Sequence, residues 1–144
     1  IGDLTTLNEV IANLTNSKYT ELSLQFILAY AFAPIIWLTG VSGADLDLVG
    51  RLLGEKLIMT EFVGYNSLSE MIQNGAFVNA KSIIMATYVL CGFANFASIG
   101  IQIGGVGGMA ENQKPILSKF GFRSLLGATL VALMSAAMVG MFIA

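Results

Sequence analysis

The fold is decided by residues 82–103, which read SIIMATYVLCGFANFASIGIQI and carry no formal charge. About 20 apolar residues in a helix are enough to cross the hydrocarbon core of a bilayer, so this stretch predicts a membrane helix. Asn95, Ser98 and Gln102 share one face of that helix, at spacings of three and four residues. Such a face can form hydrogen bonds between helices. With Gly92 close by, it also fits a binding site at an unwound helix, and the residues alone leave both possibilities open.

The composition of the whole chain agrees with a membrane protein. Of its 144 residues, 56% are hydrophobic and only 11% are charged, whereas about 25% of the residues in soluble domains are charged. The sequence has no histidine and one cysteine, Cys91, which excludes a histidine-based triad, a zinc site and an internal disulfide. No nucleophile and base stand at a recognisable spacing, so we expect neither an enzyme nor a bound metal or cofactor. The net charge of −2, without a basic run, argues against nucleic acid as a partner.

Downstream of residues 82–103, the sequence predicts a loop and a final membrane helix. Residues 104–123 contain three basic residues and one acidic residue, with Pro115 interrupting any helix. Short basic loops face the cytoplasm, so we expect a cytoplasmic loop here. Residues 124–144 carry no charge and predict a second membrane helix. Small side chains recur on it at intervals of four and form a packing face: Ala132, Ala136 and Gly140.

Two segments precede this region at the start of the chain. Apolar residues at spacings of three to four within residues 1–20 predict the end of a preceding helix and an outer linker, so we expect a piece of a larger protein. Residues 22–41 are apolar and rich in aromatic side chains, but Pro34 interrupts them. They fit either a membrane span or a helix that lies in the membrane interface.

Residues 45–72 combine an amphipathic pattern with one carboxylate in an apolar setting. A helix is expected to begin near Asp45, with Gly50 and Gly54 offering a groove for close packing. Glu61 then stands between apolar residues, where a charge at membrane depth costs about 2.5 to 3.5 kcal/mol. A re-entrant hairpin with Glu61 near its tip and an ordinary tilted span fit equally well. Glu61 is accordingly either in contact with interfacial water or part of a ligand or ion site.

Two stretches of the chain carry recognisable motifs. Residues 54–65 read GEKLIMTEFVGY, and residues 91–99 read CGFANFASI. In this order and at this distance they resemble the concentrative nucleoside transporter family, whose signatures are G-x-K-x-x-x-N-E-F-V-A-[YFM] and C-G-F-A-N with a downstream serine. Thr60 stands where the family has asparagine, and its shorter reach bears on selectivity or ion coupling. Gly64 stands where the family has alanine and is expected only to loosen the tip.

The resemblance covers essentially the whole chain and implies an all-α membrane fold. The chain would be the C-terminal part of a transporter, most of the second of two inverted repeats, within a homotrimer. Residues 22–41 would form the interfacial helix, residues 45–72 the re-entrant hairpin, residues 82–103 a broken transmembrane helix and residues 124–144 the final transmembrane helix. The implied location is the plasma membrane, in a bacterium the inner membrane, which the chain crosses more than once.

The resemblance also implies a function, which is nucleoside transport by symport of Na+ or H+, with this chain supplying the ribose-binding half of the site. Glu61, Asn95 and Ser98 are expected to bind the ribose. Phe93 would lie near the base, and Thr60 would complete the substrate site. The family's sodium site and base-contacting hairpin belong to the N-terminal half, which this chain lacks. A rival from a different class is an ion-translocating or structural subunit of a membrane complex, in which Glu61 carries protons.

Overall fold

The computed structural model of the chain describes residues 24–143, so the helix end and linker expected over residues 1–20 lie outside the described residues. In the described part every regular element is a helix, which confirms the all-α class. The elements in chain order are α2 (Leu24–Trp37), η1 (Gly43–Asp45), α3 (Leu46–Ile58), α4 (Glu61–Gln73), α5 (Ala80–Leu90), α6 (Phe96–Met109), η2 (Glu111–Gln113) and α7 (Lys114–Phe142).

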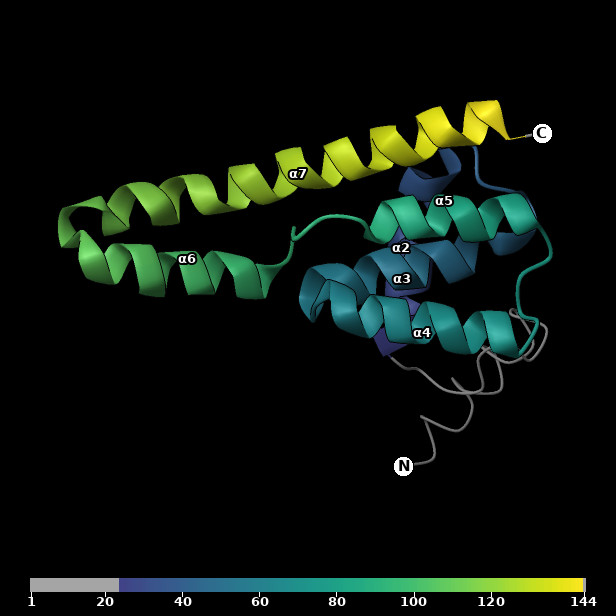
Figure 1. Ribbon diagram of the computed structural model, residues 1–144, viewed down its shortest axis with the longest axis horizontal. Coiled ribbons are helices and arrows are strands. Elements are labelled where there is room, and N and C mark those ends of the chain that lie inside the picture. Colours follow the sequence, from purple (N-terminus) through teal and green to yellow (C-terminus); the bar gives the residue numbers. More distant parts are fainter. Residues whose placement is uncertain (1–23, 144) are drawn as a thin grey trace, which may run out of the picture.

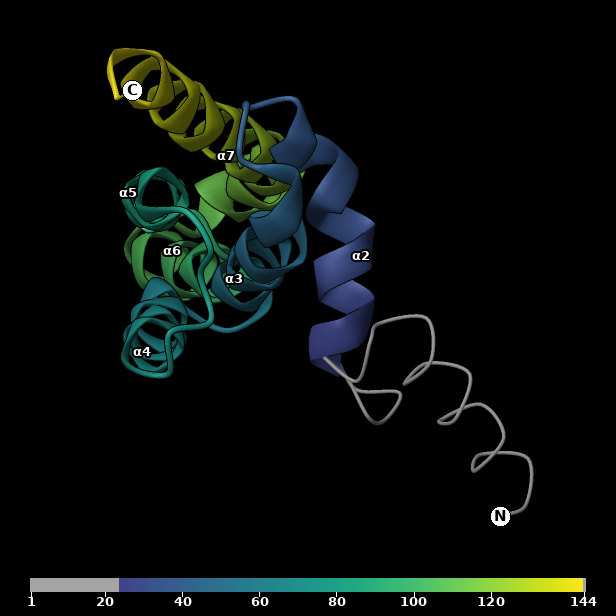
Figure 2. The same cartoon turned by 90° about the vertical axis from the view of Figure 1, so that its right-hand side faces the viewer.

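The helices form a compact body and a projecting arm (Figure 1). In the body, α3, α4 and α5 lie side by side, and the C-terminal half of α7 runs along α5. The N-terminal half of α7 extends beyond the body and packs against α6, which makes the arm. Helix α2 runs across the direction of the other helices on one side of the body (Figure 2). The α6–α7 turn is at one end of the molecule, and the C-terminus of α7 and the α4–α5 turn are at the other.

The core of the body lies where α3, α5 and α7 meet. Leu52 and Leu53 of α3, Met85 and Val89 of α5, and Ala136 of α7 are fully buried there. These positions on α3 belong to the apolar stripe of an amphipathic helix, whose burial supplies most of the stability of the element. The predicted small-residue face of the last helix is confirmed, since Ala132 and Ala136 are buried and Gly140 packs against Met85.

The groove predicted at Gly50 and Gly54 is filled by α2. A Cβ atom at Gly50 would lie 2.6 Å from the carbonyl oxygen of Ala29, and one at Gly54 would lie 2.5 Å from the Cβ of Leu28. Glycine at these two positions therefore lets the backbones of α2 and α3 approach closely, in the manner of small-residue contacts between membrane helices.

Helices α3 and α4 are joined by a turn of two residues, Met59 and Thr60, and form a helical hairpin. A buried carboxylate fixes the other end of this hairpin. Asp45 accepts hydrogen bonds from the backbone N–H groups of Val78, at 2.9 Å, and Asn79, at 3.1 Å. The start of α3 is thereby tied to the residues that lead into α5. The re-entrant placement of the hairpin in a membrane stays a prediction.

The expected cytoplasmic loop over residues 104–123 is wrong in extent. Helix α6 continues to Met109, and α7 already begins at Lys114. Pro115 interrupts the chain only by starting α7, because proline is compatible with the first turn of a helix. Contacts between the two helices stabilise the segment as helix, with Gly121 of α7 close against Ile99 of α6.

The longer α7 changes which helix meets the requirement for crossing a membrane. Residues Glu111–Phe142 form the one helix in the described part that is long and apolar enough to span. The segment over residues 82–103 is instead divided into α5, with 11 residues, and α6, with 14. At 1.5 Å per residue these are about 17 and 21 Å long, against a hydrocarbon core of about 30 Å. The two halves reach membrane length only in series.

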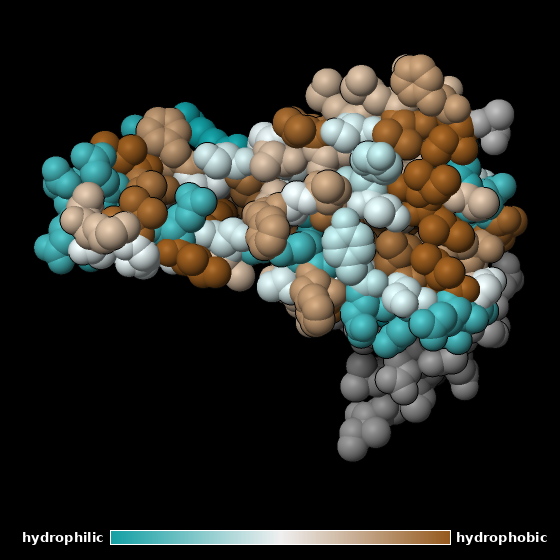
Figure 3. Space-filling view, in the orientation of Figure 1, coloured by the Kyte–Doolittle hydropathy of each residue, from teal (hydrophilic) through white to brown (hydrophobic). Residues whose placement is uncertain are grey.

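The surface of the protein has separate hydrophilic and apolar areas (Figure 3). Hydrophilic residues gather at the outer end of the arm, around the α6–α7 turn, and along the edge of the body next to α4. Large apolar side chains are exposed on α7, among them Met138, Met141 and Phe142. An exposed apolar surface of this kind is typical of a chain that contacts lipid or another protein.

Candidate functional site

The two helix interruptions of the fold lie next to each other. One is the turn between α3 and α4, and the other is the link of residues 91–95 between α5 and α6 (Figure 1). Gly92 lies in the link with a φ of 134°, in a region that other residues rarely adopt. A glycine at this position lets the chain leave α5 and start α6 within five residues.

A chain of hydrogen bonds joins three of the predicted site residues across these interruptions. The side-chain amide of Asn95 donates to Glu61 Oε2 at 2.8 Å. Asn95 Oδ1 in turn accepts from the backbone N–H of Ser98 at 2.7 Å and from its hydroxyl at 2.8 Å. The structure thus brings Glu61, Asn95 and Ser98 together, although Glu61 and Asn95 are 34 positions apart in the sequence.

Local structure explains why these side chains point at one another. Asn95 is the N-cap of α6, with extended backbone angles, so its side-chain oxygen meets the free N–H of the third helical residue, Ser98. Glu61 is the first residue of α4, where the positive end of the helix dipole favours a carboxylate. Asn95 is buried and Glu61 is half-buried. A carboxylate has about four acceptor positions, of which Asn95 uses one. The others can accept hydrogen bonds from the hydroxyl groups of a ligand.

Phe93 and Thr60 lie at the edge of this group. The Phe93 side chain is 81% exposed in the link between α5 and α6. With Asn95 and Ser98 it lines a cleft of about 250 Å³ between α6 and α7, and Glu61 is not part of that lining. Thr60 is the N-cap of α4, but its side chain makes no capping hydrogen bond. It is next to Glu61 in the turn, and the hydrogen bonds described above join Glu61, Asn95 and Ser98 without it.

The expectation that Gly64 only loosens the tip is wrong. Gly64 is buried in α4, and a Cβ atom there would lie 2.7 Å from the Cδ2 of Leu90, the last residue of α5. Glycine at this position brings α4 against the end of α5. It therefore tightens the contact between the hairpin and the broken helix.

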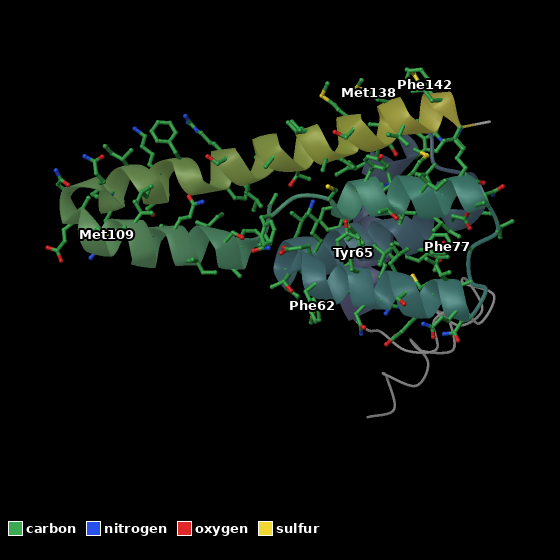
Figure 4. All side chains as sticks on the ribbon, viewed as in Figure 1. Phe62, Tyr65, Phe77, Met109, Met138 and Phe142 are labelled. Carbon is green, nitrogen blue, oxygen red and sulfur yellow. The ribbon has the colours of Figure 1, made fainter. Side chains whose placement is uncertain are left out.

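Reasoning from the sequence missed two residues that bind the C-terminal end of α5. Lys56 of α3 is fully buried and donates from Nζ to the carbonyl oxygen of Val89 at 2.9 Å. Tyr65 of α4 donates from its hydroxyl to the carbonyl oxygen of Thr87 at 3.2 Å, and its ring lies beside α5 (Figure 4). A signal for Lys56 exists in the sequence. It falls three residues after Leu53, on the apolar stripe of α3, where a core residue is expected.

Comparison with known proteins adds a family to this geometry. Residues 1–140 match the family profile described as "Na+ dependent nucleoside transporter C-terminus". The chain is 41% identical over 125 residues to NupX of Escherichia coli (strain K12), an alignment that covers 87% of the chain and 30% of NupX. It is 37% identical over 131 residues to sodium/nucleoside cotransporter 1 of Mus musculus, covering 83% of the chain and 20% of that protein.

Comparison with solved structures also finds similar transporter-length proteins that contain this fold. The fold is similar to that of CNTnw in an inward-facing substrate-bound state, with a TM-score of 0.79 and 29% sequence identity over 98% of this chain and 35% of that one. The chain therefore spans about a third or less of the length of these relatives. The relatives are transporters, which confirms the prediction that the chain is not an enzyme.

Proposed function

This chain belongs to the family of Na+-dependent nucleoside transporters, and from this premise we propose that it forms the C-terminal part of a membrane protein that transports nucleosides by cation symport. The coupling cation is Na+ or H+, bound in a part of the transporter that this chain does not contain. The complete protein is a homotrimer in the plasma membrane, in a bacterium the inner membrane.

The observation that carries this proposal is the hydrogen-bonded group of Glu61, Asn95 and Ser98 at the two helix interruptions. In many transporters the substrate binds where membrane helices are discontinuous, near the middle of the bilayer. A carboxylate can accept two hydroxyl hydrogen bonds, and the amide and the hydroxyl can each donate and accept. This combination suits the vicinal hydroxyl groups of a ribose.

We place the nucleobase next to Phe93, in the link between α5 and α6. Phe93 is two residues before Asn95 and lines the cleft that Asn95 and Ser98 also line. An exposed aromatic ring can stack on a flat base in an offset arrangement. Thr60 extends the site at the tip of the hairpin, where it flanks Glu61 at the start of α4.

The shape of the chain supports a membrane orientation for these parts. Helix α7, with 29 residues, is about 44 Å long and crosses the bilayer. Helices α3 to α6 follow its direction, so the hairpin enters the membrane and places its tip at the broken helix. Helix α2 runs across that direction, which suits an interfacial helix (Figure 2).

The substitution Glu61→Gln in the complete transporter tests the proposal. We expect it to abolish uptake of uridine and of adenosine into proteoliposomes, because the neutral amide loses the charge-assisted hydrogen bonds to ribose. The protein should still fold and assemble as a trimer, since glutamine can still accept the hydrogen bond from Asn95.

Glu70→Gln is the matched control. Glu70 is an exposed residue of the same helix, two turns beyond the site, and its carboxylate accepts a 3.4 Å hydrogen bond from Asn66. This variant should transport like the wild-type protein. Uptake that survives Glu61→Gln unchanged would remove Glu61 from the substrate site.

The same glutamate also separates the transporter from an ion-translocating subunit. Carbodiimide modifies a protonated carboxyl group at membrane depth, and a nucleoside bound to Glu61 should protect that group from modification. In a subunit that only carries protons on Glu61, added uridine or adenosine would leave the rate of labelling unchanged.

A further inference from the structure

Lys56 is the largest fully buried side chain in the described part of the protein. It lies in the last turn of α3, and its Nζ donates to the carbonyl oxygen of Val89, one residue before the end of α5. A buried ammonium loses its hydration, and one hydrogen bond to a neutral carbonyl is a weak return for that loss. The surroundings of this charge therefore call for an explanation.

The C-terminal end of α5 is held by side chains from both helices of the hairpin, α3 and α4. Lys56 comes from α3 and binds the Val89 carbonyl, while Tyr65 comes from α4 and binds the Thr87 carbonyl. The backbone N–H of Cys91 takes up the carbonyl oxygens of Thr87, at 3.0 Å, and Tyr88, at 3.2 Å. Three successive carbonyl groups at the broken end of α5 are thus satisfied, although no further turn of that helix follows.

The position of the ammonium is also specific with respect to the break. A Cβ atom at Gly92 would lie 3.9 Å from Lys56 Nζ, so the charge sits directly beside the residue at which the chain leaves α5. The C-terminal end of a helix carries partial negative charge, and a cation stabilises it. Glu61 follows Lys56 by five residues, across the turn between α3 and α4, and carries the opposite charge at the positive end of α4.

We propose that Lys56 is a built-in cation of the broken helix, whose tethered ammonium occupies the place that a bound monovalent ion takes at the carbonyl end of a discontinuous transporter helix. It is a positioning residue, because it reaches the ligand only through the break that carries Asn95 and through the field it exerts on Glu61. The proposal rests on the proposed function for its effect on transport, and on the geometry of α3 and α5 for its effect on stability.

A tethered ion can be tested by removing the tether and adding the ion back. Lys56→Ala deletes the atoms of propylammonium, so this cation should fit the space that the substitution leaves. In proteoliposomes with the complete transporter, we expect Lys56→Ala to lower the kcat/KM of uridine and adenosine uptake about 100-fold, the upper end of the cost of leaving a buried acceptor without its hydrogen bond. Millimolar propylammonium should restore at least about a tenth of the wild-type value, and the neutral isostere propanol should restore none.

Two further variants separate charge from packing. Lys56→Met keeps most of the volume without the charge, so it should lose uptake and gain nothing from propylammonium. Lys81→Ala removes a lysine from the opposite end of α5 and should transport normally with or without the amine. Wild-type uptake by Lys56→Met, or equal rescue of Lys56→Ala by propanol, would overturn the proposal.

A measurement that does not involve transport keeps the two proposals distinguishable. Thermal unfolding of Lys56→Ala in detergent should shift to higher temperature with propylammonium and not with propanol, while the wild-type protein should respond to neither. A shift specific to the cation together with absent nucleoside uptake by the wild-type protein would refute the proposed function alone. Uptake by the wild-type protein without such a shift in the variant would refute the role of Lys56 alone.

Discussion

The break between α5 and α6 and the turn between α3 and α4 interrupt helices at the same site, yet they differ in how their helix ends are satisfied. At the break, Lys56 and Tyr65 bind carbonyls of α5, and Asn95 caps α6. At the turn, Thr60 is in the N-cap position of α4 but offers no side-chain bond to the helix. One interruption is held by side chains from neighbouring elements, and the other leaves the first N–H groups of its helix without a side-chain acceptor from Thr60.

This difference assigns separate tasks to the two interruptions. The break is a fixed support, because loss of the buried bond from Lys56 would leave the Val89 carbonyl without this partner. The turn presents the carboxylate of Glu61 and the N–H groups at the start of α4, and both can form hydrogen bonds to a bound ligand. The hydrogen bond from Asn95 to Glu61 is the link between the support and the ligand-facing tip. Substitutions at Asn95, Gly64 and Thr60 test this division.

The largest effect is expected from Asn95→Asp. Aspartate retains the acceptor that caps α6 at Ser98, but it replaces the amide donor with a carboxylate facing Glu61 at the former hydrogen-bond distance of 2.8 Å. Two like charges at this distance in a partly buried site repel each other. We expect a loss of roughly 2 to 4 kcal/mol in the free energy of unfolding and at least about a 100-fold loss of uridine uptake. Thermal unfolding in detergent and uptake into proteoliposomes measure the two effects.

The chain offers an exposed counterpart for this experiment. Asn66 donates from its side-chain amide to Glu70 at 3.4 Å on the surface of α4, so Asn66→Asp also places a carboxylate beside a glutamate. Solvent screens that pair, and the variant should stay within about 0.5 kcal/mol of the wild-type protein. Comparable losses in both variants would show that Asn95 does not join the break to the tip.

Local patterns predicted the parts of this fold that depend on local chemistry. The small-residue faces and the helix that begins near Asp45 follow from composition and spacing, whereas the one membrane helix predicted from the charge-free run over residues 82–103 is divided into α5 and α6. Sequence motifs also singled out Glu61 and Asn95, which the structure brings into contact. That contact joins residues 34 positions apart, and the family resemblance rather than any spacing rule predicted that they share a site.

The errors come from contacts between distant segments. The glycines and Pro115 of residues 104–123 favour a loop by propensity, but packing of α6 against α7 keeps most of that stretch helical. Lys56 was overlooked because its partner, the Val89 carbonyl, is 33 positions away and becomes available only where α5 stops. At Gly64 the sequence predicts only a looser tip, because it does not show that Leu90, a residue of another helix, lies against this glycine.

A smaller effect is expected from Gly64→Ala, which restores the residue that the family has at this position. The new Cβ would lie 2.7 Å from Leu90 Cδ2, so the end of a fully buried side chain must shift, at a cost of about 1 to 3 kcal/mol. Alanine in place of glycine returns up to about 1 kcal/mol of helix propensity. We expect a net loss of about 1 kcal/mol in the free energy of unfolding, measured by thermal unfolding. As a control, Gly127→Ala meets nothing within 4 Å and should stabilise α7; equal stabilisation by both variants would contradict the close contact at Leu90.

The smallest effect is expected from Thr60→Asn, which gives the tip the kind of cap that the break already has. Asparagine is a better N-cap than threonine and reaches the N–H groups of the first turn of α4, so the free energy of unfolding should rise by about 0.5 to 1 kcal/mol. Thr60→Ala is the companion variant, and it should be nearly neutral because Thr60 makes no capping hydrogen bond to lose. In the wild-type protein the ligand can bind the free N–H groups at the start of α4. The asparagine cap would compete with the ligand for these groups, and uridine uptake should change only a few-fold. A loss of stability in Thr60→Ala as large as that of an ordinary N-cap, about 1 kcal/mol, would mean that the two interruptions are capped alike.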